Sequence, residues 1–300
     1  MLSGGVGGAR MARGFAAAQQ VELTVVVNVA DDETIYGLHV SPDIDTVLYT
    51  VAGIQGPHGW GRADETWAVM DQLSAFPIDT SFRLGDRDLA TNLFRTARLR
   101  EGHSLSEITR DLARVLGVPM RILPASDDRI RTEVRIADGD WLDFQTYFVF
   151  RRHADEVTDV RFDGIEDASP APGVVEAIRD ADVVLLGPSN PILSVWPIVR
   201  IPEVGEAIAR AARVALVSPL IGGAAVKGPA VQVLEGLGYP ASTRGVLDAY
   251  RGLVTDVVVD NADADEARRL DGIRVHVTDT RIGEPAAAER LAKELTTWLA

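Results

Sequence analysis

The residues best suited to chemistry in this sequence are a glycine-rich run near its start and several pairs of aspartates. The glycine run reads Ser-Gly-Gly-Val-Gly-Gly-Ala-Arg over residues 3–10. Glycine has no Cβ and tolerates positive φ, so phosphate oxygens can approach backbone N–H groups, and a following helix adds its positive dipole end. The residues predicted to hold phosphates are Gly4, Gly5, Val6, Gly7, Gly8 and Arg10. A tight turn that packs a helix on a sheet is the structural alternative.

The glycine run is not a Walker loop, because no Gly-Lys-Ser/Thr follows it. It is closer to a dinucleotide fingerprint, with Asp31 at roughly the interval where an acid binds a ribose hydroxyl, but it lacks a clean third glycine. The pattern therefore leaves open an NAD(P)-dependent dehydrogenase as an alternative to a phosphate-binding transferase.

Three aspartate pairs occur close to apolar segments. They are Asp31 with Asp32, Asp43 with Asp45, and Asp86 with Asp88 on either side of Arg87. Paired carboxylates are hard oxygen ligands that, with substrate phosphates, suit Mg²⁺. In an extended segment, Asp43 and Asp45 would point to one side, and we predict these two as metal ligands. Aspartates also cap helices, and Asp86 or Asp88 could cap a helix over residues 89–100.

Other polar loops directly follow apolar runs. These loops contain Asn28, Ser189, Asn190, Ser218, Gly222 and Gly223. Ligands of open α/β sheets bind outside the carboxyl ends of the strands, so we expect these loops and the glycine run to meet at one rim and bind a nucleotide. Lys227 could be a phosphate cation, although a solvated lysine is the simpler interpretation.

Composition excludes several classes of protein. The sequence has no cysteine, which rules out disulfides, thiolate nucleophiles and sulfur-ligated metals. A formal net charge of -14 leaves no general basic surface, so neither nucleic acid nor an anionic membrane is expected as a partner. The apolar runs are far shorter than a bilayer span, and the expected location is the cytoplasm. The five histidines are too scattered for a metal site or a catalytic triad.

The elements that must position these residues alternate between helices and strands. Helices are expected near 10–20, 173–179, 203–212 and 286–299, and strands near 23–29, 182–186, 214–217, 254–259 and 273–277. This rhythm predicts a Rossmann-like α/β fold with a mostly parallel sheet. Only Met1 and Leu2 precede the glycine run, so we expect the first strand to be truncated or supplied from an edge.

The middle of the sequence has a different pattern. Residues 62–117 contain helical stretches near 64–75 and 86–100 and a capping box from Ser104 to Glu107, without an intervening apolar strand. We predict a helical insertion over 62–117 in a discontinuous core of 1–61 and 118–300. Further strands are expected at 120–123, 132–136 and 141–150. Asp138-Gly139 is typical of a hairpin turn and would add an antiparallel part to the sheet.

Taken in order, these motifs resemble those of the 2-phospho-L-lactate transferase (CofD-like) family. They lie at residues 2–10, 28–32, 41–49, 84–91, 187–191 and 218–223, with further similarity at 124–129, 143–145 and 227–230. The resemblance extends over nearly the whole chain. Each motif is short, but their number and order make the match specific.

The resemblance implies a transferase of substituted phosphate groups that acts in coenzyme F420 biosynthesis. Such an enzyme moves 2-phospholactate or phosphoenolpyruvate from a guanosine diphosphate-linked donor to the ribityl hydroxyl of the deazaflavin Fo and releases GMP. The family also implies Mg²⁺, a Rossmann-like core with a helical insertion, and a homodimer. Which acid the donor carries does not follow from the sequence.

The family's functional residues can be carried onto matching positions here. By resemblance, Asp45 and Arg87 contact the deazaflavin or the metal, with Asp43, Asp86 and Asp88 beside them. We predict Asp45, Arg87 and Asp88 as catalytic, and the glycine run, Ser189 and Asn190 as the guanosine diphosphate site. A nucleotide-binding regulatory protein or a relative that uses another acceptor would share this cleft, and both are kept as alternatives.

Overall fold

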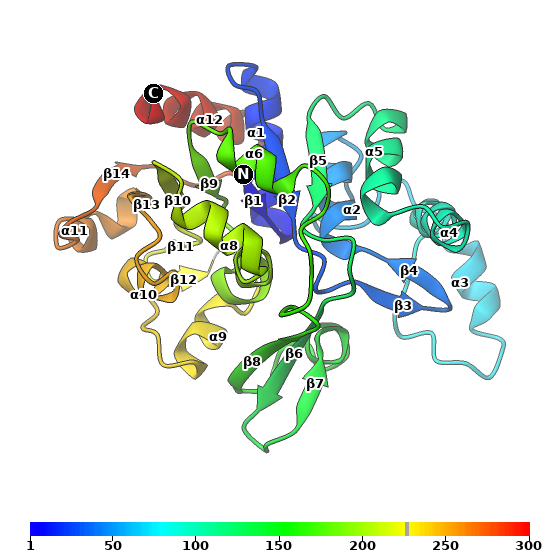
Figure 1. Ribbon diagram of the computed structural model, residues 1–300. Coiled ribbons are helices and arrows are strands. Elements are labelled where there is room, and N and C mark those ends of the chain that lie inside the picture. Colours follow the sequence, from blue (N-terminus) through cyan, green and yellow to red (C-terminus); the bar gives the residue numbers. More distant parts are fainter. Residues whose placement is uncertain (226–227) are drawn as a thin grey trace.

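The central feature of the fold is a parallel sheet of seven strands (Figure 1). The computed structural model describes residues 1–225 and 228–300, so Lys227 lies outside the described residues. In the order in which they lie in the sheet, the strands are β14 (Arg274–Thr278), β13 (Asp256–Asp260), β10 (Val214–Val217), β9 (Val184–Leu186), β1 (Leu2–Ser3), β2 (Thr24–Val27) and β5 (Arg121–Pro124). All neighbouring pairs are parallel, which confirms the predicted Rossmann-like α/β class.

Strand β1 is short but lies in the middle of the sheet. Leu2 pairs with Val26 of β2 on one side and with Leu186 of β9 on the other. The backbone of Asn28 donates to the Ser3 carbonyl at 3.0 Å and extends this pairing. The first strand is therefore short, and the alternative that it is supplied from an edge is wrong, because its two residues are held by both neighbouring strands.

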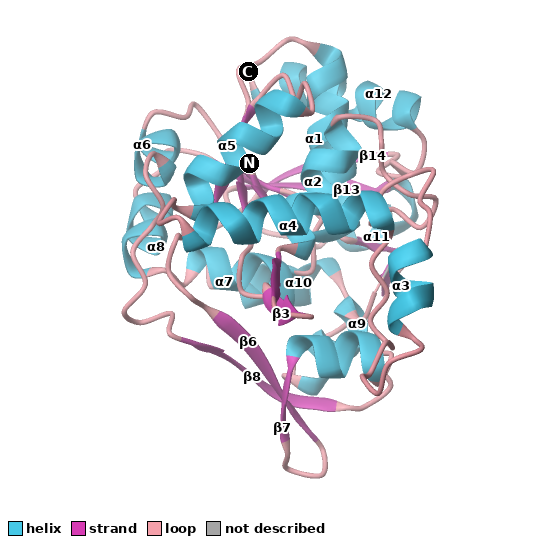
Figure 2. Cartoon of the chain, turned by 90° about the vertical axis from the view of Figure 1, so that its right-hand side faces the viewer, coloured by secondary structure: helices cyan, strands magenta, loops and turns pink. Residues whose placement is uncertain are grey.

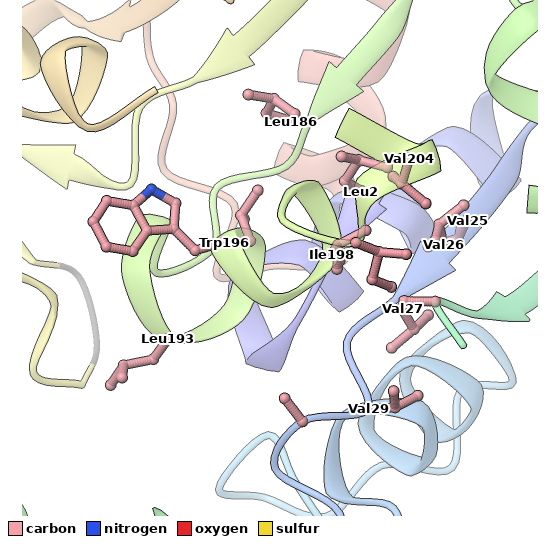
Figure 3. Close-up of a cluster of buried hydrophobic side chains, with 14 of the residues drawn as sticks. Leu2, Val25, Val26, Val27, Val29, Leu186, Leu193, Trp196, Ile198 and Val204 are labelled. Carbon is pink, nitrogen blue, oxygen red and sulfur yellow. The ribbon is translucent and has the colours of Figure 1, made fainter. Parts of the chain in front are cut away.

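Two apolar clusters cover the two faces of the sheet. Along β9 and β10, Leu185 and Ala215 belong to one cluster, whereas Leu186 and Leu216 belong to the other. This alternation follows from the two-residue period of strand side chains. Helices α1 (Gly5–Ala18) and α12 (Pro285–Leu299) supply most of the smaller cluster. Figure 3 shows part of the larger one.

Helices occupy the region where a helical insertion was predicted. They are α3 (Ala68–Leu73), α4 (Asp86–Arg100) and α5 (Leu105–Val115). The Ser104 to Glu107 capping box is present, with both reciprocal hydrogen bonds. α3 is shorter than the helix expected over 64–75. Figure 2 shows α4 lying across the face of the molecule that also carries β3 (Glu33–Ile35).

The antiparallel strands expected at 132–136 and 141–150 lie in a separate sheet of three strands, so the prediction that they extend the main sheet is wrong. β6 (Arg131–Ile136) pairs with β7 (Trp141–Asp143) and β8 (Val157–Asp163), and Figure 2 shows this unit projecting from the body. β7 ends at Asp143, not at residue 150. The Asp143 carboxylate accepts hydrogen bonds from Thr146 N (2.8 Å) and Oγ1 (2.6 Å) and so starts a helical turn, η1 (Thr146–Phe150).

The remaining elements are short, and most connect the larger ones. They are β4 (Leu38–Val40), α2 (Pro42–Val51), α6 (Val174–Arg179), η2 (Pro191–Val195), α7 (Trp196–Val199), α8 (Pro202–Ala209), β11 (Leu220–Ile221), β12 (Ala224–Ala225), α9 (Ala230–Gly236), α10 (Thr243–Ala249), η3 (Asn261–Asp263) and α11 (Ala264–Ala267). Within the described ranges, no helix combines the length and the apolar character needed to cross a membrane.

Candidate active site

The predicted loops lie at one rim because of the strand order. β10, β9, β1 and β2 are consecutive neighbours and all run parallel, so the segments after their carboxyl ends share one edge of the sheet. Two of these segments touch directly. Ser189 Oγ accepts a hydrogen bond from Gly4 N (3.2 Å) and donates one to Gly4 O (2.8 Å).

The glycine run is the first turn of α1, which begins at Gly5 and not near Arg10 as expected. Glycine is required here by close approach as well as by conformation, since Gly5 has φ +61°. A Cβ on Gly7 would lie 2.0 Å from the Pro188 carbonyl oxygen, and one on Gly4 would lie 2.6 Å from Asp43 Oδ2. The run thus packs α1 tightly against the loop after β9.

Close packing leaves part of the helix N-terminus available to an anion. Gly4 N–H donates to Ser189 and Gly5 N–H donates to Asp43 Oδ1 at 2.7 Å. The next two N–H groups, of Val6 and Gly7, belong to the first turn and have no acceptor within the helix. These groups can bind phosphate oxygens at the positive end of the helix dipole.

We expect Gly7→Ala to be strongly disruptive. The new Cβ meets a backbone oxygen, which can move only if α1 and the loop after β9 separate, so stability and nucleotide affinity fall together. A loss of about 1–3 kcal/mol in the free energy of unfolding is the expected scale. Urea denaturation and GDP titration measure the two effects. Gly283→Ala, with no atom near its added Cβ, is the matched control, and equal behaviour of the two variants would contradict the packing role.

The Asp43 and Asp45 side chains diverge, which corrects the expectation of an extended segment. Pro42 stands at the first position of α2, a place that favours proline because its missing N–H is not needed there. Residues two apart on a helix point about 200° apart, so the two carboxylates reach different partners. Asp43 faces the N-terminus of α1, and Asp45 faces Arg95 of α4.

The first network of buried polar groups surrounds Asn28. Its Nδ2 donates to Asp31 Oδ2 and to Asp43 Oδ2, both at 3.0 Å. Asp32 Oδ2 accepts from Ser41 Oγ at 2.7 Å and lies 2.9 Å from His39 Nε2. Burial raises the pKa of Asp43 to about 6. Burial and the neighbouring Asp43 charge raise the pKa of Asp31 well above its usual value.

Two carboxylate oxygens of this network are candidates for a cation. Asp31 Oδ1 and Asp32 Oδ1 are buried and have no hydrogen-bond partner. Such oxygens are the donors that Mg²⁺ prefers, so the residues fit part of its coordination shell. In residues 1–225 and 228–300, no group of three or more carboxylates or imidazoles is arranged to hold an ion.

The second network joins α2 to α4. The fully buried Arg95 guanidinium donates to Asp45 Oδ1 and, at 2.6 Å, to Asn92 Oδ1. Asn92 Nδ2 in turn donates to the Asp88 carbonyl at 2.9 Å, and Tyr49 OH donates to Asp88 Oδ1 at 2.8 Å. Burial and the Asp45 charge raise the pKa of Asp88 to about 7, which suits a proton acceptor near neutral pH.

Asp86 and Arg87 lie beside this network, and their predicted roles at the acceptor stay predictions. Asp86 accepts hydrogen bonds from Thr66 Oγ1 and from the N–H groups of Ala68 (3.0 Å) and Val69 (3.1 Å), so it caps α3. The Arg87 side chain is 54% exposed and lies 4.0 Å from Asp64. Among the described contacts, none joins Arg87 to Asp45 or Asp88.

The remaining predicted site residues have local structural partners. Asn190 Oδ1 accepts from Ile192 N (3.0 Å) and Leu193 N (3.1 Å) and caps η2. Ser218 Oγ accepts from Leu220 N at 3.3 Å. Gly222 and Gly223 have φ of +62° and +72° and form the turn between β11 and β12. The described contacts do not link the segment from Ser218 to Gly223 with Gly4 or Ser189.

Sequence reasoning missed several members of the networks. They are His39, Ser41, Tyr49, Glu65, Asn92 and Arg95. Asp88, Asn92 and Arg95 are spaced by four and three residues, which places them on one helix face, and this spacing was the available signal. Glu65 caps α4, because its carboxylate accepts from the N–H groups of Arg87 (2.7 Å) and Asp88 (2.8 Å).

Comparison with known proteins shows the family of this chain. The family model described as 2-phospho-L-lactate transferase CofD matches residues 1–289. The phosphoenolpyruvate transferase of Kitasatospora aureofaciens is 45% identical over 87% of this chain and 84% of its own length. The 2-phospho-L-lactate transferase of Methanopyrus kandleri is 39% identical over 98% of this chain and 95% of its own length.

A solved structure supports the fold. A UPF0052 family protein from Bacillus halodurans superposes with a TM-score of 0.63 at 20% identity, covering 98% of this chain and 97% of that one. The family match spans the main sheet, the glycine run and both buried networks. The chain is therefore a transferase that belongs to the 2-phospho-L-lactate transferase CofD family.

Proposed function

We propose that this transferase moves a 2-phospho-acid unit, 2-phospholactate or phosphoenolpyruvate, from a guanosine diphosphate-linked donor to the ribityl hydroxyl of the deazaflavin Fo. GMP is the second product, and the reaction belongs to coenzyme F420 biosynthesis. The names of the relatives support the two donor acids. The observation that carries the proposal is the first turn of α2, where Asp43 meets the anion-binding end of α1 and Asp45 belongs to the second network.

The donor phosphates are proposed to lie at the N-terminus of α1. The Val6 and Gly7 N–H groups bind phosphate oxygens, and the Ser189 hydroxyl fixes the adjoining loop to Gly4. Arg10, in the second turn of the same helix, adds a nearby positive charge. The net charge of the chain is -14, so the anionic donor depends on such local groups.

The chemistry is a displacement at phosphorus. The acceptor oxygen forms a bond to the phosphorus that bears the acid, and the bridging P–O bond breaks with its electron pair on the GMP phosphate. We assign Asp88 as the base that takes the hydroxyl proton, because it is only partly buried and its pKa of about 7 matches neutral pH. Asp45 orients the acceptor. Positioning and charge neutralisation carry most of such a reaction.

Mg²⁺ is proposed to bind between the donor phosphates and the Asn28 network. Asp31 and Asp32 would hold it through their unpartnered oxygens, with Asp43 beside them. A bound Mg²⁺ would neutralise charge on the phosphates. Asp45 is a weaker candidate than the sequence suggested, because its carboxylate is paired with a buried guanidinium.

We expect Mg²⁺ to raise the melting temperature of the GDP-bound protein by roughly 5 °C at saturation. The rise should shrink in Asp32→Asn, which removes one of the charges that the cation neutralises. Asp279→Asn is the matched control, because Asp279 is an exposed acid that follows the outermost strand, β14, and pairs with Arg281 and Arg290. Scanning calorimetry measures the rise. If Mg²⁺ raises the melting temperature of Asp32→Asn as much as that of wild type, the cation binds elsewhere.

The direct test of the function is incubation with Fo, Mg²⁺ and each guanylylated donor, with mass spectrometry of the products. Formation of the deazaflavin phosphodiester and of equimolar GMP is the expected result. Binding of GDP without any turnover of Fo would favour a regulatory protein or another acceptor. Saturable binding of NAD(P)H would instead favour the dehydrogenase. A homodimer and a cytoplasmic location stay predictions.

A further inference from the structure

Arg95 is unusual among the charged residues of this protein. It is the only arginine or lysine that is buried among the residues that the structure describes, and its side chain has no exposed area. A guanidinium cannot lose its proton at any ordinary pH, so burial is tolerated only where anionic or carbonyl oxygens surround it. Its position in the fold therefore requires an explanation.

The contacts of Arg95 tie three elements together. Nη2 donates to Asp45 Oδ1 on α2, while Nη1 donates to Asn92 Oδ1 (2.6 Å) on its own helix and to the His39 carbonyl (3.3 Å) at β4. A neighbouring hydrogen bond also joins α4 to β4, because Thr96 Oγ1 accepts from His39 N at 2.8 Å. The planar guanidinium fork thus fixes the position of the first turn of α2 relative to α4.

The pair is asymmetric in its exposure. The Asp45 side chain retains 7% exposure while that of Arg95 has none, so the carboxylate is the outer member and the guanidinium lies behind it. Substrate can therefore meet Asp45 but not Arg95. Burial raises the pKa of Asp45, and the Arg95 charge opposes that rise.

We propose that Arg95 is a positioning residue for transfer, which holds the Asp45 carboxylate in one orientation while never touching substrate itself. This inference rests on the proposed function. It extends that function, because a residue on α4 then positions the groups that meet the acceptor. Asn92 supports the same positioning, because its side chain accepts a hydrogen bond from Arg95 Nη1 and donates one to the Asp88 carbonyl.

The test compares Arg95→Met and Arg95→Lys with Arg213→Met in the intact protein. Arg213 is the matched control, because it pairs with the buried Asp256 at 2.9 Å and bonds the Leu299 carbonyl, at the opposite ends of the strands. Each variant is assayed for kcat of transfer, for GDP affinity by calorimetry and for melting temperature. GDP reports the donor side, where Asp43 bonds Gly5 of α1 and Asn28 rather than Arg95.

We expect Arg95→Met to lower kcat by about 100-fold while GDP affinity stays within about threefold of wild type. Arg95→Lys should recover part of kcat, because it keeps the charge but cannot reach Asp45, Asn92 and the His39 carbonyl together. Arg213→Met should lower the melting temperature and leave kcat within about twofold.

Other outcomes separate the inference from the function. If wild type transfers normally and Arg95→Met keeps its kcat, the inference is wrong. A parallel loss of kcat and GDP affinity, or an equal loss of kcat in Arg213→Met, would reduce Arg95 to a purely structural role. If Arg95→Met fails to fold, the kcat of Arg95→Lys tests the inference instead, and an unchanged kcat in that variant contradicts it. An inactive wild type would instead overturn the proposed function.

Discussion

An Asp45→Asn variant is expected to lose transfer by at least about 100-fold, because the amide cannot carry the charge that orients the acceptor. It should also unfold more easily. Removing the carboxylate leaves the Arg95 guanidinium, which has no exposed area, without its counter-ion. Breaking a buried pair in this way costs about 3–5 kcal/mol of the free energy of unfolding.

Initial rates at saturating donor and urea denaturation measure the two effects of Asp45→Asn. The matched control is Asp111→Asn, because Asp111 pairs with Arg114, whose side chain is 77% exposed. That substitution should cost less than about 1 kcal/mol and leave kcat unchanged. An Asp45→Asn protein with wild-type activity and stability would remove this residue from both the acceptor site and the second network.

An Asp88→Asn variant is expected to lower kcat by roughly 100- to 10,000-fold, the usual range for a missing general base. The pH profile gives a sharper signature. Asp88 must be ionised to accept the hydroxyl proton, so wild-type kcat should rise as pH increases through about 7 and level off above it. The variant should lack this rise. A retained rise with near-normal kcat would assign the base to another group.

Tyr49→Phe tests the same assignment through a neighbour. Tyr49 OH donates to Asp88 Oδ1, and this bond lowers the pKa of Asp88 against the larger effect of burial. Its loss should therefore move the rising limb of the profile to higher pH. Tyr250→Phe is the matched control, because that hydroxyl is equally buried but has no hydrogen-bond partner. A shift in both variants would count against a specific role of Tyr49.

The main sheet was predictable from sequence because its signals are local. Continuous apolar runs such as 214–217 are typical of parallel strands buried on both faces, and polar or glycine residues directly follow several of them. The rule that ligands bind at the carboxyl ends of parallel strands then brought Gly4 and Ser189 to one rim. The order of the motifs gave the family before any contact was known.

Local signals failed where two interpretations of the same residues compete. Asp43 and Asp45 stand two apart, which suits one face of a strand, but the Ser41-Pro42 start favours a helix, and in the fold the helix forms. Likewise, the glycine run reads as a loop, yet it forms the first turn of α1, where glycine is needed because a Cβ on Gly7 would meet the Pro188 carbonyl. Close approach of the backbone is not visible in sequence.

By itself, the sequence determined the α/β class, the position of the glycine run at the rim of the sheet and the aspartates that could carry out chemistry. Only the tertiary structure decided which aspartate belongs to which of the two buried networks. Asp43 joins Asn28 and α1, while Asp45 joins Arg95, which comes from a helix fifty residues away along the chain. The physical reason is burial. A charged side chain is stable in the interior only beside oppositely charged or polar partners, and here those partners come from segments far apart in the sequence, which no local pattern can show.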